Sequence, residues 1–207
     1  DRLQKREQVI LFLNRRGFST FVSCRSCGYV FKCEECDISM TYHKNGLLVC
    51  HYCGKTQREP KECPKCKSKY VKFFGAGTQR VEEEVKKYFN NVRILRMDVD
   101  TTRDKHSYER IYNTFKNGEA DILIGTQMVS KGLDFKNVTL VGILAADMSI
   151  NIPDYRAAER TFQIITQVAG RAGRGDKQGE VLIQTYTPQH YSLQYAVTVS
   201  YTHLTLP

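Results

Sequence analysis

Three features are absent from this 207-residue sequence, and each absence narrows what the chain can be. No stretch approaches the roughly 20 consecutive apolar residues that a membrane-spanning helix needs, which excludes that class of protein. No basic-then-apolar leader stands at the N-terminus, so we expect a cytoplasmic protein. The phosphate-binding pattern G-x-x-x-x-G-K-[ST] is also missing, because Gly54-Lys55-Thr56 has Val49 where the first glycine is required. The sequence begins with Asp rather than Met, and we expect a fragment of a longer protein.

Positive charge is present in excess. The chain has 31 lysines and arginines against 22 aspartates and glutamates, which gives a net charge of +9. A surplus of this size favours a polyanionic partner, and nucleic acid is the commonest one. A basic protein without such a partner has the same composition, so charge alone does not decide.

Four regions differ in composition. Residues 1–22 carry two apolar runs separated by the basic segment 14–17, a pattern that predicts strand, loop and strand. Residues 23–72 contain every cysteine and little periodic apolar content, so a side-chain core alone cannot hold this segment. Residues 73–196 alternate strand and helix patterns, and residues 197–207 form an atypical tail to which we assign no function.

The alternation in the third region predicts an α/β fold. Near-continuous apolar runs predict strands, and apolar stripes at helical spacing predict helices. We expect strands at 9–13, 92–97, 121–124, 138–146 and 180–186, and helices at 78–89, 108–117 and 154–169. Thr78 and Asp154 are the expected N-terminal caps of the first and last helices. Strands that alternate with helices in this way form a parallel sheet that the helices cover.

The eight cysteines are the strongest signal that spacing alone provides. They form four C-x-x-C pairs, which are Cys24 and Cys27, Cys33 and Cys36, Cys50 and Cys53, and Cys63 and Cys66. Two such turns place four sulfurs around one ion, and cytoplasmic thiols bind metal more often than they form disulfides. The sequence therefore predicts two closed zinc sites that are structural rather than catalytic. Disulfides or scattered free thiols are the weaker alternatives.

The way in which the pairs combine is less tightly constrained. Only five residues separate Cys27 from Cys33, which disfavours joining the first pair with the second. Nested pairing (first with fourth, second with third) and crossed pairing (first with third, second with fourth) both remain. We prefer the nested one, because its inner loop has the size of a zinc ribbon. Gly28 and Gly54 each follow a pair, at a point where the turn favours positive φ.

The cysteine-rich region also carries a potential binding surface. Lysines and tyrosines are interleaved between residues 31 and 70, which suits phosphates and stacked bases, although a solvated basic face has the same composition. His43 and His51 could replace a cysteine as metal ligands. Because eight cysteines already fill both sites, we expect both histidines to be surface or DNA-facing residues.

Two further segments carry phosphate chemistry. Segment 124–135 follows an expected buried strand, where amides, hydroxyls and a lysine can hold phosphate and a carboxylate can reach a ribose hydroxyl. Segment 167–175 carries two arginines three apart among glycines, and guanidiniums offer permanently charged donors to phosphoryl transfer. A basic helix end before a flexible loop would explain one arginine and one glycine, but not the whole set. The candidate residues are Thr126, Gln127, Lys131, Gly132 and Asp134 in the first segment, and Gln167, Arg171 and Arg174 in the second.

These two segments resemble motifs V and VI of superfamily 2 helicases, in which Q-x-x-G-R-x-x-R supplies the arginine finger. A closer resemblance is to the primosomal protein N′ (PriA) family of replication-restart helicases. It covers roughly residues 5–195 and includes, in order, segment 11–17, the four cysteine pairs, and segments 75–82, 153–160 and 167–174. A cysteine-rich insertion and motor motifs are more specific together than either is alone.

The resemblance implies the second RecA-like lobe of a P-loop NTPase-type helicase, with a small two-zinc, ribbon-like module inserted into it. It implies nested zinc pairing, with Cys24, Cys27, Cys63 and Cys66 at one ion and Cys33, Cys36, Cys50 and Cys53 at the other. Arg171 and Arg174 would stabilise the γ-phosphate of ATP, which is held with Mg²⁺ on an opposing lobe that this sequence lacks. The resemblance implies that Gln167 couples that site to DNA and that Asp134 and Gly132 bind the nucleotide. It also implies that the DNA backbone is bound by Thr126, Gln127 and Lys131.

The implied activity is ATP-driven movement 3′ to 5′ on single-stranded DNA at stalled forks, followed by reloading of the replicative helicase. The implied partners are forked and single-stranded DNA, primosome proteins and single-stranded DNA-binding protein, with no membrane partner. One alternative is another superfamily 2 fork translocase, but those lack an eight-cysteine insertion at this point. A second alternative is a non-enzymatic zinc-ribbon adaptor that binds nucleic acid, which would be indifferent to the loss of Arg171.

Overall fold

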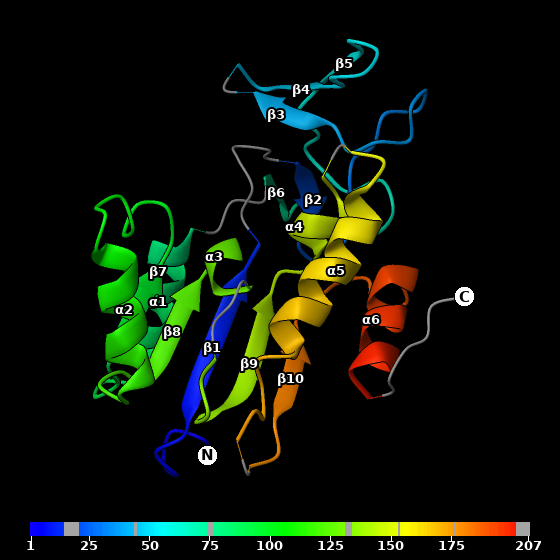
Figure 1. The fold of residues 1–207 in the computed structure, drawn as a ribbon. Coiled ribbons are helices and arrows are strands. Elements are labelled where there is room, and N and C mark those ends of the chain that lie inside the picture. The colour runs from blue at the N-terminus through cyan, green and yellow to red at the C-terminus, as the bar shows by residue number, and fades with distance from the viewer. Residues whose placement is uncertain are drawn as a thin grey trace.

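The computed structural model describes residues 1–14, 21–43, 45–73, 77–130, 134–152, 154–175 and 177–201. Its largest element is a five-stranded parallel sheet in the order β10-β9-β1-β8-β7 (Figure 1). The strands are β1 (Gln8–Leu13), β7 (Ile94–Met97), β8 (Ile122–Gly125), β9 (Val138–Leu144) and β10 (Glu180–Ile183). Because β1 pairs with both β8 and β9, the N-terminal strand forms the middle of the sheet.

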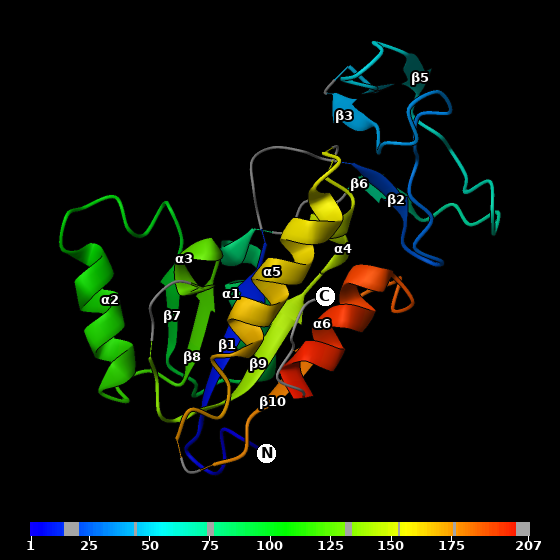
Figure 2. The same cartoon turned by 45° about the vertical axis from the view of Figure 1, so that its right-hand side comes forward.

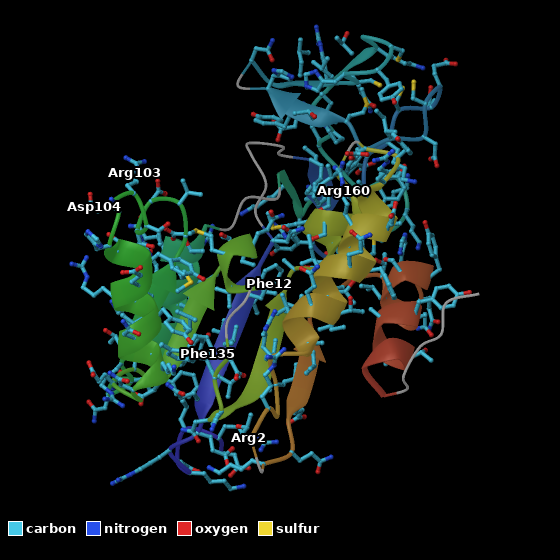
Figure 3. The ribbon with its side chains drawn as sticks, in the orientation of Figure 1. Arg2, Phe12, Arg103, Asp104, Phe135 and Arg160 are labelled. Carbon is cyan, nitrogen blue, oxygen red and sulfur yellow. The ribbon has the colours of Figure 1, made fainter. Side chains whose placement is uncertain are left out.

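Helices lie on both faces of this sheet. They are α1 (Thr78–Tyr88), α2 (Ser107–Lys116), α3 (Gln127–Ser130), α4 (Asp147–Ile150), α5 (Ala157–Ala169) and α6 (Tyr191–Tyr201). Alternate residues of β1 serve the two faces, because Ile10 and Phe12 join the core under α2 and α5, whereas Val9 joins the core under α1. Phe12 and Phe135, labelled in Figure 3, both belong to the first of these cores. α6 packs beside α5 at the β10 edge (Figure 2).

A small β-rich module follows β1 and precedes α1. β2 (Val22–Cys24) pairs antiparallel with β6 (Val71–Phe73), and β3 (Thr41–His43), β4 (Leu47–Val49) and β5 (Thr56–Arg58) form an antiparallel sheet. In Figure 1 the module stands above α4 and α5, on the side where the strands of the parallel sheet end. The buried residues of its own cluster, among those described, are Val22, Phe31, Cys33, Met40, Leu48 and Cys50. A core of this size does not stabilise a fold without another constraint.

The fold class expected from the sequence is confirmed, since the chain forms a parallel-sheet α/β lobe. All five expected strands and all three expected helices are present, with ends that shift by a few residues. Of the second apolar run in residues 1–22, Val22 begins β2, and residues 15–20 lie outside the described part. Every helix within the described ranges is too short or too polar to pass through a bilayer.

The two expected helix caps are wrong. Thr78 is the first residue of α1 rather than its cap, and its hydroxyl donates a 2.5 Å hydrogen bond to the carboxylate of buried Asp98. Asp154 lies two residues before the cap of α5, where its carboxylate accepts hydrogen bonds from the backbone N–H of Arg156 and from the side chain of Arg160. Both side chains are therefore used by tertiary or turn contacts, which a local cap pattern does not register.

Candidate functional sites: two thiolate clusters and an arginine edge

Two clusters of four cysteine sulfurs lie in the module, and within each cluster all sulfurs are within 4.8 Å of one another. The clusters are Cys24, Cys27, Cys63 and Cys66, and Cys33, Cys36, Cys50 and Cys53. The arrangement is therefore nested rather than crossed. The sulfur–sulfur distances are 3.5 Å for Cys24–Cys66, 3.7 Å for Cys27–Cys63 and 3.6 Å for Cys33–Cys53. Sulfurs bound to one tetrahedral zinc are separated by about 3.8 Å, whereas a disulfide requires about 2.05 Å, so the spacing fits metal ligands.

Each cysteine pair sits on the same type of turn. In all four turns the N–H of the residue four positions after the first cysteine donates a 2.9 Å hydrogen bond to that cysteine's carbonyl. These residues all have positive φ: Gly28 and Gly54 at +75°, Asp37 at +51° and Lys67 at +59°. The expectation for the two glycines is confirmed. The backbone turn thus sets the direction of each sulfur pair.

The thiols of each cluster differ in how readily they ionise. In the second cluster, the backbone N–H of Cys53 outweighs burial and lowers the pKa of Cys50 to about 7. Burial and the neighbouring sulfurs of Cys53 and Cys50 raise the pKa of Cys36 to about 12. In the first cluster burial opposes ionisation of Cys24, but the N–H groups of Cys27 and its neighbour outweigh it and lower that pKa to about 6. A divalent cation such as Zn²⁺ among the four sulfurs would favour their thiolate form, because its charge offsets the burial and mutual repulsion of the sulfurs.

The module is held against the lobe by specific contacts. Gly28, in the first cysteine turn, lies directly against Tyr186, and the Ser39 hydroxyl donates a hydrogen bond to the Asn151 carbonyl. The segment around Tyr186 is fixed in turn by buried Asp147, whose carboxylate accepts from the Tyr186 N–H at 3.0 Å and from neighbouring threonine hydroxyls at 2.9 and 3.1 Å. The contacts join the first cysteine turn to the chain between β10 and α6.

A pair of glycine substitutions tests this junction. Gly28→Ala introduces a Cβ 2.3 Å from the Tyr186 Cβ, whereas Gly54→Ala, at the same +75° φ in the third cysteine turn, meets nothing within 4 Å. Both changes should cost about 1–2 kcal/mol for the left-handed backbone. Only Gly28→Ala should also increase hydrogen exchange at the amides of residues 185–191, measured by mass spectrometry on the zinc-loaded chain. Equal exchange in the two variants would show that the Gly28–Tyr186 contact does not hold the module.

Two arginines and an aspartate gather where α5 ends. Arg174 Nη1 lies 3.4 Å from Asp134 Oδ1, and Arg174 Nε donates a 2.8 Å hydrogen bond to the Gly170 carbonyl. Gly173 has a φ of +70°, and a Cβ there would lie 2.5 Å from the backbone nitrogen of Gly179, so only glycine fits this turn. Asp134 of the first segment and Arg174 of the second, 40 residues apart, thus meet at one edge of the lobe, beside the start of β9. Thr126 and Gln127 of the first segment do not lie there, because they follow the C-terminal end of the parallel strand β8.

Arg171 lies half-buried at the same edge. Burial lowers the pKa of Arg171 and the positive charge of Arg174 lowers it further, while Asp134 and Tyr108 oppose the shift. A guanidinium keeps its proton under such perturbation, because its ordinary pKa is above about 12. Two permanently positive groups share the single carboxylate of Asp134 in this group of three, which leaves a net attraction for an anion such as a phosphate group.

Two of the three residues expected to contact DNA, Thr126 and Gln127, directly follow the C-terminal end of β8. Thr126 is only 9% exposed, and Gln127 is partly exposed and donates a 3.1 Å hydrogen bond from Nε2 to Asn14 Oδ1. The Asn14 amide in turn donates to Ser149 Oγ at 2.5 Å. This chain of side chains links the ends of β1 and β8 to α4. Lys131 and Gly132 lie outside the described residues.

Gln167 is exposed in the last turn of α5, which ends at Ala169, and Arg171 lies in the turn that follows the helix, where its N–H donates to the Val168 carbonyl. Gln167 is therefore near the arginine edge along the chain, but it does not share a helix face with Arg171. The described candidates therefore fall into two groups, Gln167, Arg171, Arg174 and Asp134 at the end of α5 and Thr126 with Gln127 at the end of β8.

Two residues were assigned no function from the sequence, although both lie in segments that carry the family resemblance, 11–17 and 153–160. Asn14 is buried and bridges Gln127 to Ser149. Tyr155 is 79% exposed just before α5, and the Arg156 guanidinium lies 5.1 Å from the centre of its ring. An exposed aromatic ring beside a guanidinium is a platform on which a base can stack.

Comparison with protein families gives two matches. The family described as "Helicase conserved C-terminal domain" matches residues 65–176. The family described as "PriA DNA helicase Cys-rich region (CRR) domain" matches residues 33–58, which contain the whole second cysteine cluster. Both parts of the chain, the parallel-sheet lobe and the cysteine module, thus have a counterpart.

Individual proteins match over nearly the whole chain. Replication restart protein PriA of Bacillus subtilis (strain 168) is 58% identical over 96% of this chain and 25% of its own length. The protein of the same name from Synechocystis sp. is 55% identical over 95% of this chain and 24% of its own length. The chain spans about a quarter of the length of these curated relatives. Among solved structures, the C-terminal domain of the DEAD-box protein Dbp5 is 13% identical over 96% of this chain and 72% of its own, with a TM-score of 0.46.

Proposed function

Since this chain belongs to the family that carries the conserved helicase C-terminal domain, and within it is similar to PriA over nearly its whole length, we propose that it is the zinc-binding portion and second motor lobe of a replication-restart DNA helicase. The full-length protein would use ATP and Mg²⁺ to move 3′ to 5′ and to bind forked and single-stranded DNA. The lobe would comprise residues 1–22 and 73–196, with the zinc module at 23–72. Its working compartment would be the cytoplasm.

In this proposal the arginine edge completes a nucleotide site on an opposing lobe. Arg171 and Arg174 would donate to the γ-phosphate as negative charge develops there, and Asp134 and Gly132 would contact the nucleotide. The contact between Arg174 and Asp134 supports this assignment, because it brings the two motor segments within 3.4 Å of each other. Gln167, in the last turn of α5, would couple the site to DNA.

DNA would run along the end of the sheet where the strands terminate. Thr126, Gln127 and Lys131 would follow its backbone, and the Gln127–Asn14–Ser149 chain would hold that contact to the centre of the sheet. Tyr155 would offer a stacking surface close to the zinc module. The module itself would meet the fork and the protein partners of the full-length enzyme, which we propose to be primosome proteins and single-stranded DNA-binding protein.

The observation that carries the proposal is the joint presence of both family matches in one continuous, 58%-identical stretch. A zinc-ribbon adaptor would need the module at residues 33–58 but has no use for a motor lobe that places arginines at one edge. The two-part match therefore favours the helicase over the adaptor.

Strand separation by the full-length protein that contains this chain tests the proposal. With ATP, the protein should unwind a labelled fork that has a 3′ single-stranded tail. No separated strand should form when ATP is omitted or when the fork has a 5′ tail instead. Normal binding to both forks without ATP-dependent unwinding would favour the adaptor instead.

A further inference from the structure

Two histidines converge on the surface of the zinc module, outside both cysteine clusters. His43 is the last residue of β3, and His51 directly follows Cys50. Their Nε2 atoms are 3.3 Å apart, while the ring centroids are 5.3 Å apart and the ring planes are inclined by 51°. The rings are thus not stacked face to face, and the contact between them joins the two Nε2 nitrogens.

The separation matches two ligands of one ion. Imidazole nitrogens bind Zn²⁺ at about 2.0–2.1 Å, and at a tetrahedral angle this puts two of them about 3.3–3.4 Å apart. A hydrogen bond from N–H to an acceptor is usually shorter, near 2.9–3.0 Å. We propose that His43 and His51 form a third metal site, which takes a divalent transition metal ion of the kind that imidazole prefers, such as Zn²⁺ or Ni²⁺.

The backbone holds both histidines in place. His43 is paired with Leu47 in the ladder between β3 and β4, and its carbonyl accepts a 3.0 Å hydrogen bond from the Gly46 N–H. His51 lies in the third cysteine turn, where the Cys50 N–H donates to the Lys55 carbonyl at 2.9 Å. Zinc at the second cluster would fix that turn further. Because both ligands are on restrained backbone, binding of an ion should cost little further conformational entropy.

The proposed site is open, unlike the two thiolate sites. Among the described residues, the groups of three or more potential ligand side chains within 4.8 Å of one another are the two cysteine clusters. The histidine pair therefore has no third His, Cys, Asp or Glu ligand there. Two tetrahedral positions remain for water or for an oxygen donor of another molecule. An ion held by two imidazoles should exchange readily and should not be needed for folding.

Metal counting on the zinc-loaded chain, purified without a histidine tag, tests the site. After equilibrium dialysis against Zn²⁺ at increasing concentration, the unaltered chain should reach three zinc ions, two retained on removal of free metal and one lost. His43→Ala and His51→Ala should each lower the affinity for the third ion, while the other two ions stay bound. The loss should be at least roughly 10–100-fold, which is the effect of removing a hydrogen-bond partner that merely orients a metal ligand. The matched control is His106→Ala, which removes another exposed histidine and should leave the count at three.

Two results would overturn the proposal. One is saturation of the unaltered chain at two ions, which would make the 3.3 Å contact between the two Nε2 atoms a hydrogen bond. The other is a third ion that persists in both single variants. Nitrogen-15 NMR of the rings supplies an independent measurement, because Zn²⁺ should shift the Nε2 signals of both histidines together. The result does not depend on unwinding activity, so failure here leaves the proposed helicase function untouched.

Discussion

Replacement of Arg171 by alanine in the full-length protein is expected to lower DNA-stimulated ATP hydrolysis by roughly a thousandfold or more, the loss typical of an arginine finger. The physical reason is that Arg171 would supply permanent positive charge from a half-buried position at the end of α5, where solvent screens it weakly. Binding of single-stranded DNA should change little, because the expected DNA contacts lie at the end of β8. The measurement is steady-state ATPase with and without DNA, paired with a binding assay.

Two controls make the Arg171 result interpretable. Arg103→Ala removes an exposed arginine that pairs with Asp100, away from the end of α5, and should leave turnover within a few-fold. Arg171→Lys should not restore activity, since an ammonium lacks the planar fork of a guanidinium. Turnover within a few-fold of normal in Arg171→Ala, in a protein that still carries its zinc, would remove Arg171 from the nucleotide site and favour the adaptor interpretation.

Loss of one ligand in the second thiolate cluster is expected to unfold the module and spare the lobe. Cys50 is fully buried and belongs both to that cluster and to the small core around Phe31 and Leu48. A structural zinc contributes an apparent 10–16 kcal/mol or so, which is about as much as the entire stability of a typical domain. Cys50→Ser should therefore remove one of two zinc ions and most amide protection in residues 41–58. The core under α2 and α5 contains no cysteine and should keep its protection.

Tyr52→Ser is the matched control, because it alters the same cysteine turn at an exposed position that is not a ligand. That variant should keep two zinc ions and a protected module. Metal content and hydrogen exchange are measured on the same samples. If Cys50→Ser kept both ions, another side chain would be acting as ligand, and His51 beside it would be the first to examine.

The parallel sheet and the zinc ligands could be predicted because their signals are local. β8 is buried along its whole length, so it reads as an uninterrupted apolar run that ends at a polar segment. A C-x-x-C pair is equally local, since one turn sets the direction of both sulfurs. Loop length favoured nested pairing over crossed pairing, and the cluster geometry agrees.

Other features could not be predicted because they depend on contacts between distant residues. β2 and β6 have three residues each, too few to show a period of two. The Thr78 hydroxyl bonds to Asp98 on the neighbouring strand end, so the local cap pattern failed. α6 continues past residue 196, where the sequence suggested a boundary, and buries Leu193 and Ala196 while Tyr191 and Tyr195 stay exposed. No sequence pattern predicts the contact between Gly28 and Tyr186, which are 158 positions apart.

The antiparallel pairing of β2 with β6 affects how easily the cysteine module can be inserted into or deleted from the lobe. Val22 and Phe73 are direct partners, so the two ends of the module lie side by side. A hairpin turn of about two residues would bridge that gap without altering the order of the five parallel strands. The cysteine module could therefore be lengthened, shortened or removed in a single insertion or deletion that leaves the parallel-sheet lobe unchanged.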